Sequence, residues 1–254
     1  MIILLVAGSC VIDDNRELTH LAFCPRKVSV LLISPGAQEK WEYGGNSGIY
    51  WLDMAGNAVE EDNFFLSVQT SNYDPIDEYK EIDPDFDRNY ASPVLYYYDP
   101  FEHLDDPIPG IEQQISASYN KYAERSRSGK DYANRLNVEY RTTGIKQLTI
   151  SALNTVLFGK QPGESLNDYF TIAEYDPRIV ISSSGNMLIY GYSHNILDFP
   201  KSVGEWLNLS PMGQRAMFLT FNEKISDLPV SVRFVVQMET SEGLLLSDTT
   251  RLIT

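Results

Sequence analysis

A mainly β fold is predicted by three features of this 254-residue sequence. Runs of β-branched and aromatic residues are short, and Gly, Pro, Asn and Asp separate them, as in sheets joined by turns. Residues 230–238 alternate apolar and polar side chains with a period of two, which indicates a half-buried strand. Glu242-Gly243 then turns the chain back into residues 244–253, which begin with three leucines and complete a hairpin. These features predict an immunoglobulin-like β-sandwich that carries short helices and long acidic loops.

The other strands are predicted by similar runs, taken in chain order. Residues 28–34 and 64–70 are rich in Val, Ile, Leu and Phe, and Pro35-Gly36 predicts a turn after the first of them. Residues 41–53 predict a loop and a strand. Later strands are expected at residues 147–152, 179–181, 187–190 and 216–221, and the second and third of these form a hairpin-like pair.

Two short helices are predicted by capping boxes, in which a serine is followed three residues later by an acid. Ser165 precedes Asp168 in this way, and Ser202 precedes Glu205. Residues 111–127 leave two alternatives open. Ile111 and Ile115 recur at helical spacing, whereas residues 115–118 also fit a strand.

The first ten residues predict a lipoprotein signal segment. An apolar run leads into Ala7-Gly8-Ser9-Cys10, which is the order of the apolar region of a signal peptide and its cleavage site. These four residues resemble the lipobox of bacterial lipoproteins. The resemblance implies that the Cys10 thiol receives lipid and that the protein is held to a membrane. A buried first strand with an incidental cysteine is the alternative.

Asp13-Asp14 resembles the acidic tract that accompanies export of Bacteroidetes lipoproteins to the outer face of the outer membrane, and a solvated linker is its alternative. We therefore expect a lipid-anchored, surface-exposed outer-membrane protein with a tether over residues 11–26. A β-rich domain over 27–254 follows, with a sub-boundary near residue 110 and a C-terminal sandwich over 110–254.

Cys24 has no partner for an internal disulfide if Cys10 is lipidated. It lies in an apolar setting between Phe23 and Pro25, which predicts a small buried residue rather than a nucleophile. If the signal segment is retained, a disulfide between Cys10 and Cys24 is the alternative.

Acidic residues dominate the sequence, whose formal net charge is −15. A surface of this sign does not neutralise phosphates, so nucleic acid is not expected as a partner. Between Asp53 and Glu112 there are 16 acidic residues, against only Lys80 and Arg88 as bases. Prolines recur throughout this part of the chain and exclude a long helix, so an extended acidic excursion is predicted over 72–110.

No cofactor is predicted, and Ca²⁺ is the one metal ion for which the acidic excursion offers candidate ligands. Oxygen atoms recur at alternate positions, as in loops that wrap a hard cation, at Asp83, Asp85, Asp87 and Asn89. Arg88 stands where such a loop has glycine and Val94 where it has a bidentate glutamate, so a solvated acidic loop is the alternative. The histidines show no metal-binding spacing; they are His20, His103 and His194.

No catalytic residue is predicted, and the aromatic residues give the best hint of a ligand. Faces on which sugar rings would stack are offered by Trp41, Tyr50, Trp51 and Tyr97. Aromatic rings with acids and amides nearby suit a neutral glycan. Packing in the core or at an interface, with the polar tip in water, is the alternative for all four side chains.

The second half of the chain resembles an uncharacterised Bacteroides-type lipoprotein family, a domain of unknown function. The resemblance is carried by residues 144–151 (GIKQLTIS), 157–159 (LFG) and 162–170 (PGESLNDYF). It implies an envelope lipoprotein and supplies no catalytic residues. The expected function is therefore non-catalytic binding or adhesion at the surface, toward a glycan or a protein. A glycan-acting enzyme and a structural subunit of a surface assembly are the alternatives.

Overall fold

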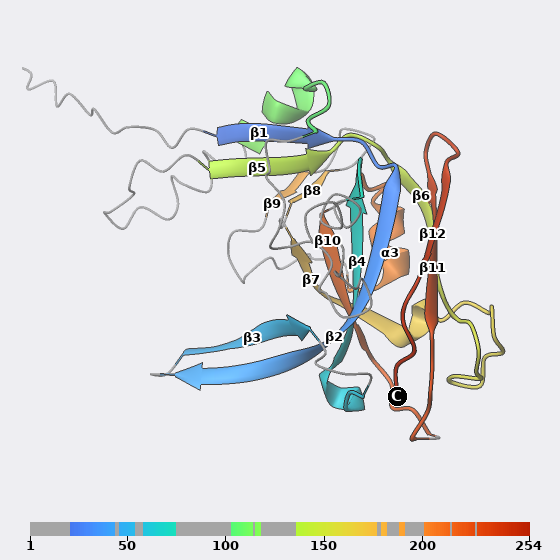
Figure 1. Cartoon of the computed structure of the whole chain (residues 1–254). Helices are drawn as coiled ribbons and strands as arrows, with labels where there is room; N and C mark the ends of the chain where they lie inside the picture. The colour runs from blue at the N-terminus through green and yellow to red at the C-terminus, as the bar shows by residue number, and fades with distance from the viewer. Residues whose placement is uncertain are drawn as a thin grey trace, which may run out of the picture.

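Figure 1 shows the computed structural model of the chain. The structure describes residues 21–43, 46–53, 58–74, 103–113, 115–117, 136–176, 179–181, 188–190, 201–213, 215–226 and 228–254. The predicted mainly β fold is confirmed, because the sheets pack as sandwich-like layers and the helices are few and short.

Twelve strands are named within these residues. They are β1 (Leu21–Arg26), β2 (Val30–Tyr43), β3 (Asn46–Asp53), β4 (Phe64–Ser71), β5 (Leu136–Arg141), β6 (Ile145–Ala152), β7 (Phe170–Asp176), β8 (Ile179–Ile181), β9 (Leu188–Tyr190), β10 (Ala216–Phe221), β11 (Phe234–Thr240) and β12 (Leu245–Thr249). The named helices are η1 (Glu61–Asn63), η2 (Asn167–Tyr169) and α3 (Val203–Asn208), and residues 109–113 and 115–117 are also helical.

Two antiparallel sheets form the sandwich. One has the strand order β3-β2-β4-β10-β7, and the other has the order β12-β11-β6. Two smaller pairs complete the described sheets, a parallel pair of β1 with β5 and an antiparallel pair of β8 with β9. The expected hairpin-like pair over 179–190 and the terminal hairpin are thereby confirmed.

One core lies between the two large sheets. The alternation over 230–238 places Phe234 and Val236 of β11 inside with no exposed surface, and Met238 is 2% exposed. Four phenylalanine rings from both sheets meet there, at Phe64, Phe170, Phe221 and Phe234. Burial of such large side chains contributes about 1.5–3 kcal/mol each, which makes this cluster a main source of stability.

Helix α3 covers the core beside β6 and β7. The Ser202 hydroxyl accepts a hydrogen bond from the Glu205 backbone N–H (3.1 Å), which confirms Ser202 as the N-cap. The Glu205 carboxylate accepts one from the N–H of Lys201 (2.7 Å), the residue before the cap, rather than from Ser202 as in a capping box. The cap directs Trp206 into the core, where it is fully buried. The other predicted helix is a single 3₁₀ turn, η2, in which Ser165 Oγ accepts from the Asn167 N–H (3.3 Å).

The tether expected over 11–26 was too long at its C-terminal end. Residues 21–26 form β1, which pairs along its length with β5. Cys24 and Arg26 of this strand are fully buried, which a solvated tether would not allow. The sub-boundary near residue 110 is likewise not seen in the sheets, because β4 pairs with β10. A sandwich of residues 110–254 alone would therefore lack β2 and β4.

The turn predicted at Pro35-Gly36 was wrong, because both residues lie inside β2. The Ile33 N–H points away from β4, toward the Asp248 carboxylate (2.8 Å). Pro35, two residues on, faces the same way, and β3 pairs with β2 only from Gly36 onward. The missing N–H of Pro35 therefore removes no hydrogen bond from the ladder, which is the setting in which strands tolerate proline.

The edge of β6 that does not face β11 is covered by residues 163–167, in which the Asn167 side chain makes two hydrogen bonds. Its Oδ1 accepts a hydrogen bond from the Ile150 N–H (2.9 Å), and its Nδ2 donates to the Leu148 carbonyl (2.7 Å). The Leu166 N–H also donates to the Ile150 carbonyl (2.7 Å). The side-chain amide and the backbone N–H groups of this segment thus satisfy the backbone groups of the edge, as a neighbouring strand would.

Replacing Asn167 with alanine is expected to lower the free energy of unfolding by about 1–3 kcal/mol, because the Ile150 N–H and the Leu148 carbonyl lose their partners. Urea unfolding followed by circular dichroism measures the loss. Asn208→Ala, at the exposed last residue of α3, is the matched control and changes the midpoint little. Equal midpoints for the two variants would contradict this role of Asn167.

Candidate functional site

The structure offers two candidate sites, and the first is a buried cluster of charges where β1 and β5 diverge. Arg26 and Arg141 end these strands directly opposite each other. Beyond them β1 leads into β2 of the five-stranded sheet, and β5 leads into β6 of the three-stranded sheet. The Thr142 N–H donates to the Arg26 carbonyl (2.8 Å), and the Val28 N–H donates to Thr143 Oγ1 (3.0 Å). We call this point the fork.

Glu139 lies between the guanidinium groups of the fork. Its Oε1 is 3.3 Å from Arg26 Nε and accepts a hydrogen bond from Arg141 Nη1, and its Oε2 is 3.9 Å from Arg215 Nε. The side chains of Arg26, Glu139 and Arg141 are at most 5% exposed. Burial lowers the pKa of the Arg141 guanidinium, and the neighbouring Glu139 carboxylate acts in the opposite direction. The carboxylate thus stabilises the charged form of a group that burial disfavours.

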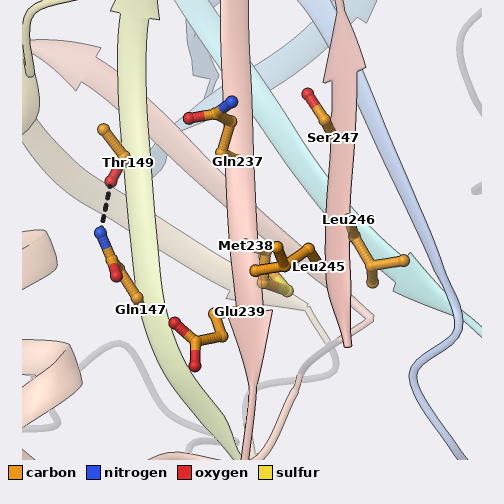
Figure 2. A pocket seen from close by; sticks show the side chains of 8 residues that line it. All are labelled: Gln147, Thr149, Gln237, Met238, Glu239, Leu245, Leu246 and Ser247. Atoms are coloured by element: carbon orange, nitrogen blue, oxygen red, sulfur yellow. Dashed lines mark hydrogen bonds between the residues drawn. The ribbon is translucent and has the colours of Figure 1, made fainter. Parts of the chain in front are cut away.

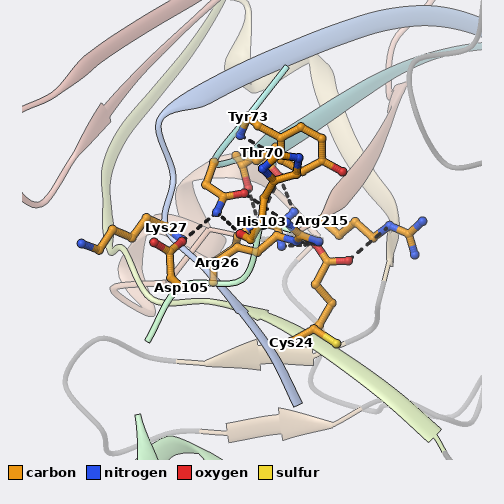
Figure 3. A network of polar contacts seen from close by, with 12 residues as sticks. Cys24, Arg26, Lys27, Thr70, Tyr73, His103, Asp105 and Arg215 are labelled. Atoms are coloured by element: carbon orange, nitrogen blue, oxygen red, sulfur yellow. Dashed lines mark hydrogen bonds and ion pairs between the residues drawn. The ribbon is translucent and has the colours of Figure 1, made fainter. Parts of the chain in front are cut away.

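Further polar groups, among them the Asp105 carboxylate, surround Arg26 at the fork (Figure 3). Asn72 Oδ1 accepts from Arg26 Nη1 (3.1 Å), and Asn72 Nδ2 donates to the His103 carbonyl (2.5 Å) and to Asp105 Oδ2 (2.8 Å). The Lys27 N–H donates to the same Asp105 oxygen (2.7 Å). Each of these contacts joins chain segments that are far apart in sequence. This arrangement is suited to holding segments together rather than to reacting with a ligand.

The space beside the fork is small. A cavity of about 10 Å³ lies against Arg141 and Arg215, and its other lining residues are Leu32, Gln69, Thr70, Ser71 and Tyr73. This volume is about what one water molecule needs. The fork is therefore assigned a structural role, and the second site is the better candidate for binding.

The second candidate site is a groove on the outer face of the three-stranded sheet, with a volume of about 200 Å³ (Figure 2). Its lining residues are Gln147, Thr149, Gln237, Met238, Glu239, Leu245, Leu246 and Ser247. The strand register sets the outward-facing residues in rows. One row is Thr149, Gln237 and Ser247, and the next is Gln147, Glu239 and Leu245. Neighbours in such a row are about 4.5–5.5 Å apart, so their polar atoms reach one ligand together.

At a β-bulge beside the groove, Glu239, the one acidic residue of its lining, forms an ion pair with Lys146. Between Glu239 and Thr240 the register with β6 shifts, which leaves Lys146 without an opposite residue. The Lys146 ammonium forms an ion pair with Glu239 Oε1. Bulges re-aim side chains in this way at the margins of sheets. The charges of Glu239 and Lys146 therefore cancel, and the other residues that line the groove are uncharged. The whole protein, in contrast, has a formal charge of −15.

The remaining residues singled out in the sequence fall in several places. Cys24 is fully buried, which confirms its prediction as a buried apolar residue, and its thiol is 3.8 Å from the Ala22 carbonyl. The β2–β3 register pairs Trp41 with Gly48, Tyr50 with Glu39 and Trp51 with Gln38. These three aromatic residues thus lie on one hairpin, away from the groove. The positions outside the described residues are Cys10, Asp83, Asp85, Asp87, Asn89 and Tyr97.

The described part of the chain offers neither a metal site nor a membrane-spanning helix. No three His, Cys, Asp or Glu side chains there lie close enough together to hold a metal ion. No helix of the same residues is both long and apolar enough to span a bilayer. The Ca²⁺ ligands and the lipid anchor expected from the sequence thus remain predictions.

Neither site was predicted from the sequence, although part of the signal was present. In residues 147–150, Gln147 and Thr149 alternate with buried Leu148 and Ile150, so the polar face of the strand was readable. What joins this face to Gln237 and Ser247 is the strand register, which is a non-local property. Nothing in the sequence predicted that Arg26 is buried. Charged residues are rarely buried unless they are paired, and its partner Glu139 is distant in the sequence.

Replacing Glu139 with glutamine is expected to lower the free energy of unfolding by about 3–5 kcal/mol, because Arg26 and Arg141 lose the carboxylate that they share. Denaturant titration measures the change. Glu242→Gln, in the exposed turn between β11 and β12, is the matched control and shifts stability by about 0.5 kcal/mol or less. A loss of less than 1 kcal/mol for Glu139→Gln, on the same scale, would argue against a supporting role for the fork.

Gly213 packs against the fork so closely that a side chain does not fit. A Cβ there would lie 2.5 Å from Val28 Cγ2 and 3.3 Å from Arg141 Cγ. Gly213→Ala is therefore expected to destabilise the protein by about 1–3 kcal/mol. Gly204→Ala in α3, where the nearest atom is 4.0 Å away, is expected to raise stability by up to about 1 kcal/mol. Thermal melting of both variants tests the contrast, and the reverse order would refute it.

Comparisons of the chain with protein-family models, with curated proteins and with solved structures found no match. The groove and the N-terminal sequence are therefore the features that bear on function.

Proposed function

We propose that this protein is a lipid-anchored, surface-exposed outer-membrane protein that binds a ligand without transforming it. The observation that carries the binding role is the groove on the outer face of β6, β11 and β12. Its polar side chains stand on three strands that are paired with one another throughout, so their positions are fixed before a ligand arrives. A preorganised surface loses little conformational entropy on binding.

The anchor follows from the N-terminal sequence. Ala7-Gly8-Ser9-Cys10 supports lipid attachment at Cys10, and Asp13-Asp14 supports export to the outer face. One acyl chain gives only marginal membrane binding, so stable anchoring requires more than one chain on the modified cysteine.

The described fold sets a limit on how far the domain stands from the membrane. The first described strand, β1, begins at Leu21, eleven residues after Cys10. A chain of that length reaches at most about 40 Å when fully extended. Arg26, buried in the fork, holds β1 to the rest of the protein. A lipid anchor on Cys10 would therefore keep Leu21 within about 40 Å of the membrane, and the acidic domain would be repelled by anionic lipid head groups.

Labelling with a fatty-acid probe in the native host tests the anchor. Wild type is expected to incorporate the probe, and Cys10→Ala is expected to lose it. Cys24→Ala is the matched control and keeps the label, because the Cys24 thiol is buried in the fold. Protease treatment of intact cells is expected to digest the wild-type protein. An unlabelled wild type would overturn the lipid anchor, and a labelled but protease-resistant protein would overturn display at the surface.

A further inference from the structure

We propose that the groove of the three-stranded sheet binds a neutral glycan, with Gln237 at its centre. The proposal rests on the binding role given above and names the ligand class of that same site.

Hydrogen-bonding groups that both donate and accept dominate the polar part of the groove. Gln147 and Gln237 carry side-chain amides, and Thr149 and Ser247 carry hydroxyls. Gln237 lies between the two hydroxyl residues in one row across the sheet. The hydroxyl groups of a sugar also donate and accept, and adjacent ones on a ring are spaced for a single amide. Such a row therefore matches several hydroxyls of one sugar at once.

An apolar wall borders this row. This wall is the Leu245 side chain, because Leu245 is 75% exposed, whereas its neighbour Leu246 and the opposite Met238 pack on the core side of the sheet (Figure 2). A pyranose ring has C–H faces as well as hydroxyls, so it can cover Leu245 while its hydroxyls meet Gln237. Removing this leucine surface from water contributes to binding, at about 25 cal/mol per Å².

The charge of the groove selects against ionic ligands. The Glu239 carboxylate is paired with Lys146, so the polar row faces the ligand with neutral groups. The net charge of −15 repels sulfated and uronic-acid glycans at moderate ionic strength. With a volume of about 200 Å³, the groove is smaller than sites for drug-sized ligands. It suits the terminal sugar of a glycan better than a long segment.

The test measures binding of the full-length protein in detergent to a panel of tetrasaccharides by isothermal titration calorimetry. The neutral arm holds tetrasaccharides ending in glucose, galactose, mannose or N-acetylglucosamine. The anionic arm holds sulfated and uronic-acid tetrasaccharides, and a short uncharged peptide stands for a protein ligand. Binding is expected in the neutral arm alone.

Variants locate the bound sugar. Gln237→Ala and Leu245→Ala are each expected to weaken binding by about fivefold to tenfold, since each removes one contact of about 1 kcal/mol. Both positions face outward, so both variants are expected to unfold at the wild-type midpoint. Gln161→Ala, at an exposed glutamine outside the groove, is the matched control and keeps wild-type affinity.

Three results would overturn the proposal: no binding in the neutral arm, stronger binding of the peptide or the anionic arm, or neutral binding that Gln237→Ala and Leu245→Ala leave unchanged. Failure of the anchor is distinguishable, because Cys10→Ala alters lipid labelling and leaves the affinity of the groove as it is.

Discussion

A pair of buried arginines that share one carboxylate is the constraint on which the rest of the structure depends. Arg26 and Arg141 end the two parallel strands, and beyond them the chain enters two different sheets. Moving a charge out of water costs several kcal/mol, and Glu139 offsets that cost only while all three side chains keep their places. The two sheets therefore diverge at a point where a small displacement of these side chains would weaken their ion pairs and destabilise the fold.

The fork also explains how the groove acquires fixed walls. β6 follows β5 directly, so its direction is set where Thr142 and Thr143 are bound to the β1 side of the fork. β11 then pairs with β6, and β12 pairs with β11. The inward residues of these strands join the common core, which leaves the outward amides and hydroxyls in register. The fork and the groove are thus connected through β5, β6 and the strands that pair with β6.

Local patterns in the sequence predicted the parts of the fold that depend on neighbouring residues. The alternation over 230–238 and the N-cap at Ser202 are of this kind, since each signal lies within one element. The errors concern pairing between distant segments. Residues 21–26 looked like a tether because their partner, β5, is more than a hundred residues away in the chain. Pro35 was predicted to lie in a turn, but a strand accepts proline where no neighbouring strand needs its N–H. That condition depends on where β3 begins to pair with β2. The groove was missed for the same reason.

Asn167 and Asp248 have a consequence wherever many copies of this protein are concentrated together. A sheet with a bare margin invites the margin of a neighbouring molecule, and high local concentration favours such joining. On the three-stranded sheet, a carboxamide covers one margin at Ile150, and a carboxylate links the other to Ile33. Two short polar side chains thus keep adjacent molecules from polymerising through this sheet while its outer face stays open.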